Sequence, residues 1–293
     1  MPDYSILSSE RGIRAVKWSF VCLMITALLQ AVVVILSGSI ALLADTIHNF
    51  GDAATAIPLG VAFILAKSKP SKRFTYGYGR VEDLAGIIIV LIILFSALVA
   101  GYESVTRLLH PQKIGHLYAV IAASIIGFLG NEAVAIFRIR VGKEIGSAAL
   151  IADGYHARVD GWTSLAVLFG AMGVWLGYPL ADPIIGLVIT AAILVIVWQA
   201  GKQIFIRILD GVDPGVIDEI KETASTVEGV AEVSGIKARW IGHNLHTQFS
   251  IGVKSALSAG DVEEIVREVS HKLRSNVSHL TDAAVNVVTL KQE

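Results

Sequence analysis

Long apolar runs dominate the first two-thirds of the chain and predict membrane-spanning helices. Six segments of at least 20 residues are continuously apolar, without the alternation of a half-buried strand, at about 15–36, 40–66, 84–105, 117–137, 147–176 and 184–206. A helix of about 20 such residues crosses a hydrocarbon core roughly 30 Å thick and satisfies its own backbone hydrogen bonds. The pattern therefore predicts an all-α, six-helix transmembrane domain over residues 1–210.

The hydropathy pattern changes after Asp210, and residues 211–293 are predicted to form a separate domain. No apolar run in this part of the sequence is long enough to span a membrane. The periodic segments predict helix, strand, strand, helix and strand at about 214–226, 229–240, 245–254, 259–275 and 283–290. Pro214 suits the first turn of the first helix, and Ser258 suits the cap of the second. This αββαβ order predicts a small α+β domain of ferredoxin-like or metallochaperone-like type, which pairing with a second copy would stabilise.

Composition agrees with a membrane protein and argues against several other classes. The 293 residues are 54% hydrophobic and 17% charged, whereas an ordinary soluble domain carries about 25% charge. The formal net charge of −1 argues against nucleic acid as a partner, because neutralising a phosphate backbone needs a basic face. The single cysteine, Cys22, cannot by itself build an internal disulfide or a thiolate metal cluster.

Basic residues are concentrated on one side of the predicted spans. They precede the first span and fill the links after the second and the fourth: Arg11, Arg14, Lys17, Lys67, Lys69, Lys72, Arg73, Arg80, Arg138, Arg140 and Lys143. The opposite links hold far fewer. By the positive-inside rule, both termini of this multi-pass protein of the cell or inner membrane are predicted to face the cytoplasm.

A short repeat relates the second predicted span to the fifth. Residues 38–52 and 146–160 are identical at eight of fifteen positions, at an offset of 108. An odd number of crossings separates the two spans, so they are expected to run in opposite directions. Transporters built from two inverted halves show this pattern, and they commonly place the substrate near the bilayer midplane.

The repeat carries the motif Asp-x-x-His-x-x-x-Asp in both copies. Spacings of three and four place each trio on one helix face. Carboxylates deep in a membrane cost on the order of 2.5–3.5 kcal/mol each, so they require a partner. Two imidazoles and two carboxylates match a tetrahedral site that suits Zn²⁺ better than Mg²⁺ or Ca²⁺. We predict four metal ligands, His48, Asp52, His156 and Asp160, and two further aspartates that orient the histidines in preference to binding metal directly, Asp45 and Asp153.

Histidine ligands suggest how metal movement is coupled to protons. With an unperturbed pKa near 6.5, an imidazole binds either a proton or a metal ion near neutral pH. The hypothesis is therefore exchange of metal for protons across the membrane. An intramembrane zinc hydrolase and a metal sensor without transport are the alternatives. The chain has no His-Glu-x-x-His motif, and four protein ligands leave no open position for water, so a transporter without enzymatic activity or organic cofactor is favoured.

These motifs resemble those of the cation diffusion facilitators, a family of dimeric, proton-coupled exporters of divalent metals. The resemblance covers essentially the whole chain and rests on both repeated motifs, on Tyr76-Gly77-Tyr78-Gly79-Arg80 and on Ala181-Asp182-Pro183. It implies a homodimer whose C-terminal domain dimerises and senses metal. In that family a His and an Asp on each of two helices goes with zinc preference, often with Cd²⁺ or Co²⁺ accepted. Export of another metal, such as Fe²⁺, Mn²⁺ or Ni²⁺, is the alternative.

Two parts of the chain depart from the family's pattern. Residues 69–75 (KPSKRFT) supply no His or Asp ligand, so a second site near the membrane is expected to be missing. In the C-terminal domain, the histidines that some members use are replaced by Asp261-Val262-Glu263 and by residues 285–290, so metal sensing is expected to be weak or altered. The cytoplasmic ligand candidates, for which a surface role is the simpler interpretation, are His243, His246, Asp261, Glu263, His271 and His279.

One further pair of charges lies inside the predicted spans. Glu132 is in the fourth span and Arg158 is in the fifth. Because Arg158 is two residues from His156, it is predicted to face away from the metal side of its helix. An ion pair between the two neighbouring helices is the simplest account of both charges.

Overall fold

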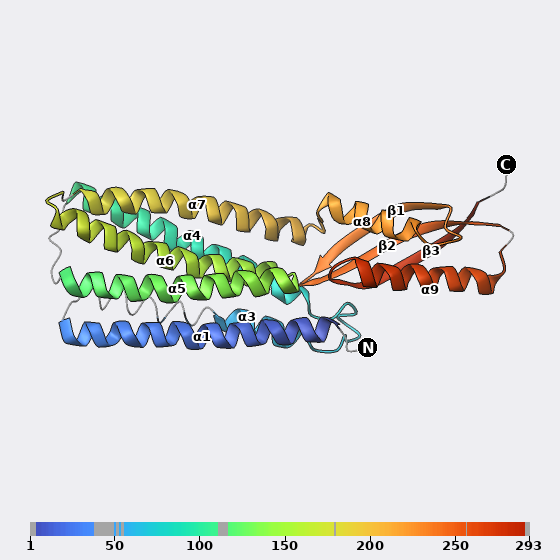
Figure 1. Ribbon diagram of the computed structural model, residues 1–293, viewed down its shortest axis with the longest axis horizontal. Coiled ribbons are helices and arrows are strands. Elements are labelled where there is room, and N and C mark those ends of the chain that lie inside the picture. Colours follow the sequence, from blue (N-terminus) through green and yellow to red (C-terminus); the bar gives the residue numbers. More distant parts are fainter. Residues whose placement is uncertain are drawn as a thin grey trace. The chain divides into compact units, whose positions relative to one another are not determined.

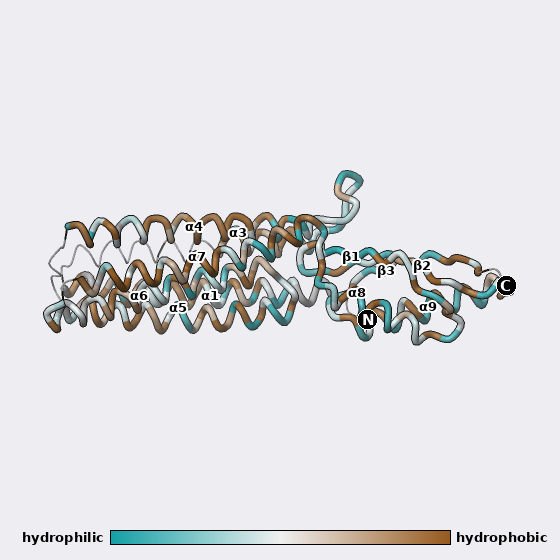
Figure 2. Tube along the Cα trace, turned by 90° about the horizontal axis from the view of Figure 1, so that it is seen from above, coloured by the Kyte–Doolittle hydropathy of each residue, from teal (hydrophilic) through white to brown (hydrophobic). Residues whose placement is uncertain are grey.

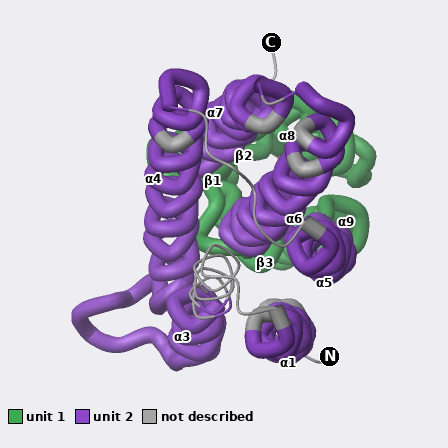
Figure 3. The backbone as a smooth tube through the Cα atoms, turned by 90° about the vertical axis from the view of Figure 1, so that its left-hand side faces the viewer, with its two compact units in different colours: residues 1–8, 205–293 green, residues 9–204 purple. Residues whose placement is uncertain are grey.

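The computed structural model describes residues 4–37, 50, 53, 56–110, 117–178, 180–255 and 257–290. The chain divides into two compact units (Figure 3). One unit is Ser9–Ile204, and the other comprises Met1–Ser8 and Phe205–Glu293. Each unit is described separately below.

The unit Ser9–Ile204 is built from long helices. Its helices are α1 (Tyr4–Ser37), α3 (Ala56–Ala66), α4 (Arg80–Leu109), α5 (Leu117–Ile145), α6 (Ala148–Trp175) and α7 (Ala181–Ile208) (Figure 1). Hydrophobic residues prevail along α4 and α3 (Figure 2). Among the described residues, four stretches are long and apolar enough to cross a membrane: Ser9–Val33, Arg80–Leu109, Tyr118–Ile145 and Pro183–Ile208.

The predicted count of six spans is not confirmed by the residues that the structure describes. Helix α6 has 28 residues, about 42 Å at a rise of about 1.5 Å per residue. It is therefore long enough to cross a membrane. It is not among the four apolar stretches, and it carries the charged residues Asp153, Arg158 and Asp160. Much of the predicted second span, residues 40–66, lies outside the described residues, and its described part is the 11-residue helix α3.

The predicted link between the fourth and fifth spans is much shorter than expected. Helix α5 continues to Ile145 rather than ending near residue 137, so Arg138, Arg140 and Lys143 belong to the helix. Hydropathy marks where the apolar run ends, whereas basic residues are good helix formers and favour the last turns of a helix. The turn between α5 and α6 is reduced to two residues, in which Gly146 has a positive φ of 73°.

Two glycines allow α5 and α6 to pack closely along each other. A Cβ atom on Gly142 would lie 2.8 Å from the side chain of Ile151, and one on Gly154 would lie 2.7 Å from that of Ile139. Both distances are shorter than real side-chain contacts. Small residues at such positions let helix backbones approach each other in a membrane, and here they bring the polar residues of the two helices together.

The C-terminal domain confirms the predicted αββαβ order. Its elements are α8 (Pro214–Ser225), β1 (Glu232–Ile241), β2 (Asn244–Lys254), α9 (Ala259–Asn276) and β3 (Leu280–Leu290), and each boundary lies within three residues of its prediction. The sheet order is β1-β2-β3, with β1 antiparallel and β3 parallel to β2. The core side chains come from both helices and the sheet, including Ile220, Phe249, Ile251, Val269 and Leu273.

Both helices of this domain begin at a side-chain cap. The Asp213 carboxylate accepts a hydrogen bond from the Gly215 backbone N–H, with Pro214 in the first turn of α8. Ser258 and Asp261 form a reciprocal capping box at the start of α9. The predicted cap at Ser258 is therefore confirmed, and it satisfies backbone donors that the helix itself leaves unpaired.

Candidate metal centre

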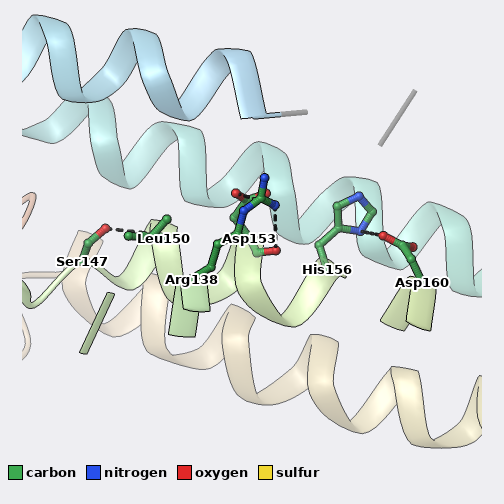
Figure 4. Close-up of polar contacts among 6 residues, drawn as sticks. All are labelled: Arg138, Ser147, Leu150, Asp153, His156 and Asp160. Atoms are coloured by element: carbon green, nitrogen blue, oxygen red, sulfur yellow. Dashed lines mark hydrogen bonds and ion pairs between the residues drawn. The ribbon is translucent and has the colours of Figure 1, made fainter. Parts of the chain in front are cut away.

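Helix α6 places two of the predicted metal ligands next to each other. The side chains of His156 and Asp160 are 1% and 4% exposed, and His156 Nδ1 lies 3.7 Å from an Asp160 carboxylate oxygen (Figure 4). Their four-residue spacing puts them on one face of the helix. An imidazole nitrogen and a carboxylate oxygen, both suitable ligands for a divalent metal, therefore face the same buried space.

The other half of the predicted site lies outside the described residues. His48, Asp52 and Asp45 all belong to that undescribed part of the chain. Among the described residues, no group of three or more His, Cys, Asp or Glu side chains is placed to hold a metal ion. The part of the chain that the structure describes thus brings together two of the four predicted ligands, and the four-ligand site stays a prediction.

Asp153 takes part in a buried ion pair that the sequence did not predict. One of its carboxylate oxygens lies 2.9 Å from Arg138 Nη1, and both side chains are at most 1% exposed. The same guanidinium nitrogen also lies 3.5 Å from the backbone carbonyl oxygen of Asp153. The predicted role of Asp153 in orienting a histidine remains a prediction, because the contact shown for its carboxylate is with Arg138.

The Arg138–Asp153 pair lies beside the two predicted metal ligands on α6. Asp153 precedes His156 by three residues, about 4.5 Å along the helix axis. The side chains of Asp153, His156 and Asp160 leave α6 on the same side, where the guanidinium of Arg138 joins them (Figure 4). A guanidinium stays charged at physiological pH and repels a nearby divalent ion. The Asp153 carboxylate offsets that charge next to the place where a metal would bind.

The spacing of polar residues along α5 is the signal that identifies Arg138 as an inward-facing residue. Ser124, Asn131 and Arg138 follow one another at intervals of seven residues, and all three are buried. A seven-residue interval returns to nearly the same face of a helix. The apolar run alone places Arg138 in a cytoplasmic link, which hides this seven-residue spacing.

The predicted ion pair between Glu132 and Arg158 is confirmed. Arg158 donates two hydrogen bonds to the Glu132 carboxylate, from Nη2 at 2.7 Å and from Nε at 3.2 Å. The two side chains are 25% and 26% exposed, unlike the fully buried pair of Arg138 and Asp153. Bidentate geometry of this kind fixes the relative position of α5 and α6 as well as neutralising both charges.

Three of the cytoplasmic ligand candidates lie on α9. Asp261 accepts hydrogen bonds from the backbone N–H and the hydroxyl of Ser258, and these bonds lower the pKa of its carboxyl group. Glu263 and His271 are exposed to solvent. Asp261 is thus occupied as a helix cap, and the structure assigns no shared site to the three residues.

The other three candidates lie in the β1–β2 turn, near the start of β2 and just before β3. His243 is buried, His246 Nδ1 lies 3.8 Å from an Asp282 carboxylate oxygen, and the His279 ring packs 5.9 Å from the Trp240 ring. Burial lowers the pKa of His246, and the Asp282 carboxylate opposes this shift. Burial also lowers the pKa of His279, and the charges of Arg207 and His243 act in the same direction.

Family models match nearly the whole chain. The model described as the cation efflux transmembrane domain matches residues 16–206, and the model described as the cation efflux protein cytoplasmic domain matches residues 212–287. The two matched segments cover most of the helical unit and most of the αββαβ domain.

Individual proteins agree with these models. A probable cation efflux system protein of Mycobacterium tuberculosis is 52% identical over 284 residues, which cover 97% of this chain and 86% of that protein. A cadmium, cobalt and zinc/H(+)-K(+) antiporter of Bacillus velezensis is 26% identical over 268 residues, which cover 90% of this chain and 85% of that protein. A solved MamM CTD structure is 25% identical, covers 26% of this chain and 94% of its own, and has a TM-score of 0.26.

Proposed function

Because the chain belongs to the cation diffusion facilitator family of metal transporters, we propose that it exports divalent metal ions, with Zn²⁺ preferred, in exchange for protons. The observation that carries this proposal is the buried pair of His156 and Asp160 on α6, with Nδ1 and a carboxylate oxygen 3.7 Å apart. Nitrogen and oxygen donors together suit Zn²⁺ better than the all-oxygen shells that Mg²⁺ and Ca²⁺ favour.

The proposed binding site combines the two copies of the sequence repeat. His48 and Asp52 from residues 38–52 would complete a four-ligand site with His156 and Asp160. Because the two copies belong to spans of opposite direction, this arrangement places the ion between two inverted halves. Rocking of one half against the other then exposes the site to each side of the membrane in turn.

In this proposal, protons and metal ions compete for the same two side chains on α6. A protonated His156 and an ionised Asp160 attract each other at the observed separation, whereas a metal ion requires the neutral imidazole. Binding a metal at this pair therefore releases a proton, and binding a proton favours release of the metal. The Bacillus velezensis relative, whose name describes an antiporter of cadmium, cobalt and zinc with protons and potassium, supports both the coupling and the choice of metals.

We propose that the transporter works as a homodimer with both termini in the cytoplasm. The basic residues near the ends of α1 and α5 support this orientation. The family model for the cytoplasmic domain and the exposed Val287 and Val288 on β3 support pairing through the C-terminal domain. Deletion of residues 212–293 should weaken dimerisation more than metal binding in the membrane, and an undiminished dimer would contradict this assignment.

Competition transport in proteoliposomes tests the proposal most directly. Zn²⁺ should be transported in preference to Cd²⁺, Co²⁺, Mn²⁺ and Fe²⁺, and its flux should depend on the pH gradient. His156→Asp should shift the preference towards harder ions such as Mn²⁺, because a carboxylate replaces an imidazole. Thr163→Ala is the matched control, because Thr163 lies on the same helix and its hydroxyl donates a hydrogen bond to the Val159 carbonyl oxygen of that helix.

Two results would contradict the proposal. Unchanged metal preference in His156→Asp would remove this residue from the site. A zinc flux that does not depend on the pH gradient would contradict the proposed coupling to protons. An absence of flux with intact metal binding would instead favour the metal sensor without transport.

A further inference from the structure

A cleft between α5 and α6 lies apart from the metal ligands. It has a volume of about 370 Å³ and is lined by Ile136, Ile139, Arg140, Lys143, Glu144 and Arg158. Lys143 and Arg140 lie about 3 and 7.5 Å from the end of α5 at Ile145, at a rise of about 1.5 Å per residue. The cleft therefore starts at the basic end of the helix and continues towards its apolar part.

Two of the cations in this cleft are available to a ligand. Arg158 is held by Glu132 through two hydrogen bonds, and the carboxylate of Glu144 is held by Arg11 on α1. Arg140 and Lys143 are both exposed, and the part of the chain that the structure describes shows no ion pair for either. The free charge of the cleft is thus positive and concentrated at its outer end.

The inner part of the cleft is apolar. Ile136 is 52% exposed on the surface of α5, one turn further from the helix end than Arg140. Helix α5 is one of the helices long and apolar enough to cross a membrane, so in a bilayer this surface would face hydrocarbon. The cleft consequently presents cations at the depth of the headgroups and an apolar wall below them.

We propose that this cleft binds the phosphate of an anionic phospholipid, with Arg140 and Lys143 as its ligands and Ile136 against an acyl chain. Basic pockets between transmembrane helices are suited to anionic headgroups. A free phosphate ion shares the headgroup chemistry but makes no use of the apolar wall. A second copy of the chain is a poor occupant, because a twofold contact here would bring identical unpaired cations together.

Lipid binding to the full-length protein tests this proposal. Purified protein in neutral detergent is titrated with phosphatidylglycerol, with phosphatidylcholine and with inorganic phosphate, and bound lipid is counted by native mass spectrometry. The double variant Arg140→Gln/Lys143→Gln should bind phosphatidylglycerol at least about tenfold more weakly. The matched control Arg14→Gln/Lys17→Gln removes two exposed cations from α1 outside the cleft, and it should change the affinity less than about twofold.

Several outcomes would overturn the proposal. Equal losses in both double variants would mean general attraction to a basic surface. Equal binding of phosphatidylcholine, or displacement of the lipid by inorganic phosphate, would exclude a site for an anionic lipid. Loss of the dimer in the cleft variant would make the cleft an interface between copies. Because the readout is bound lipid, its failure is separate from any failure of metal transport.

Discussion

The helical unit and helix α9 of the C-terminal domain use the same ionisable residue types in opposite settings. In the helical unit Arg138, Asp153, His156 and Asp160 are at most 4% exposed. In the C-terminal domain Asp261, Glu263 and His271 are exposed on α9. A buried charge needs a partner, whereas water already solvates an exposed one. The ionisable side chains on α6 therefore need a partner, whereas those on α9 do not.

Two aspartates near the starts of their helices show this difference most clearly. Asp153 on α6 lies 2.9 Å from a guanidinium nitrogen, with both side chains buried. Asp261 on α9 accepts hydrogen bonds from the neutral Ser258 in solvent. The first pair joins two ionisable side chains away from solvent, and the second completes a helix terminus. The predictions below test this contrast, from the largest expected effect to the smallest.

Arg138→Met is expected to have the largest effect on stability. It leaves the Asp153 carboxylate buried without its cation, which costs about 3–5 kcal/mol for a buried pair. The midpoint of thermal unfolding in detergent should fall sharply, and Arg138→Met/Asp153→Leu should recover much of the loss. Arg140→Met is the control, because Arg140 is exposed on the same helix. Equal destabilisation by both single variants would refute the importance of the buried pair.

Glu132→Gln should have a smaller effect on the same unfolding midpoint. The Glu132–Arg158 pair is about one-quarter exposed, so Arg158 can reach polar surroundings when its partner is neutralised. We expect the free energy of unfolding to fall by about 1–2 kcal/mol, because the two charge-assisted hydrogen bonds are weakened while the guanidinium can still reach solvent. A loss as large as that of Arg138→Met would show that exposure does not separate the two pairs.

Ser258→Ala moves the comparison to the exposed domain and should cost about 1 kcal/mol, the usual contribution of a helix cap. Hydrogen exchange should speed up at the first amides of α9 while the core of the sheet keeps its protection. Ser275→Ala is the control, because its hydroxyl bonds the His271 carbonyl at the opposite end of α9 and caps no free donor. Equal exchange rates at the first amides of α9 in both variants would contradict the capping role of Ser258.

The sequence predicts the exposed domain more completely than the helical unit, for a physical reason. In α8, α9 and the sheet, local signals such as Pro214 and Ser258 act within a few residues of the boundary that they mark. Helix α5 continues beyond the end of its apolar run. It can do so because Arg138, which follows that run, forms an ion pair with Asp153 on α6. A hydropathy pattern cannot predict this contact between two helices. The spacing of His156 and Asp160 did predict their shared face, since a helix fixes it locally.

The smallest expected effect concerns the pH dependence of the C-terminal domain. Burial and the neighbouring charges of Arg207 and His243 lower the pKa of His279 in the folded domain. The unfolded chain therefore binds more protons, and the contribution of His279 to stability is present above about pH 6.5 and lost as the pH falls below it. One site gives at most about 1.4 kcal/mol per pH unit, and a partly buried histidine gives less.

His279→Gln should flatten this dependence. Protection of β3 amides from hydrogen exchange, measured between pH 5.5 and 7.5, should fall less steeply on acidification in the variant than in the natural protein. The comparison uses the slope because residue 279 has a φ of 64°, and a change of side chain there also alters the absolute stability. His271→Gln removes a histidine from the exposed face of α9 as a control. If both variants keep the original slope, the acid sensitivity of this domain arises elsewhere, and burial near Trp240 does not distinguish His279 from a solvated histidine.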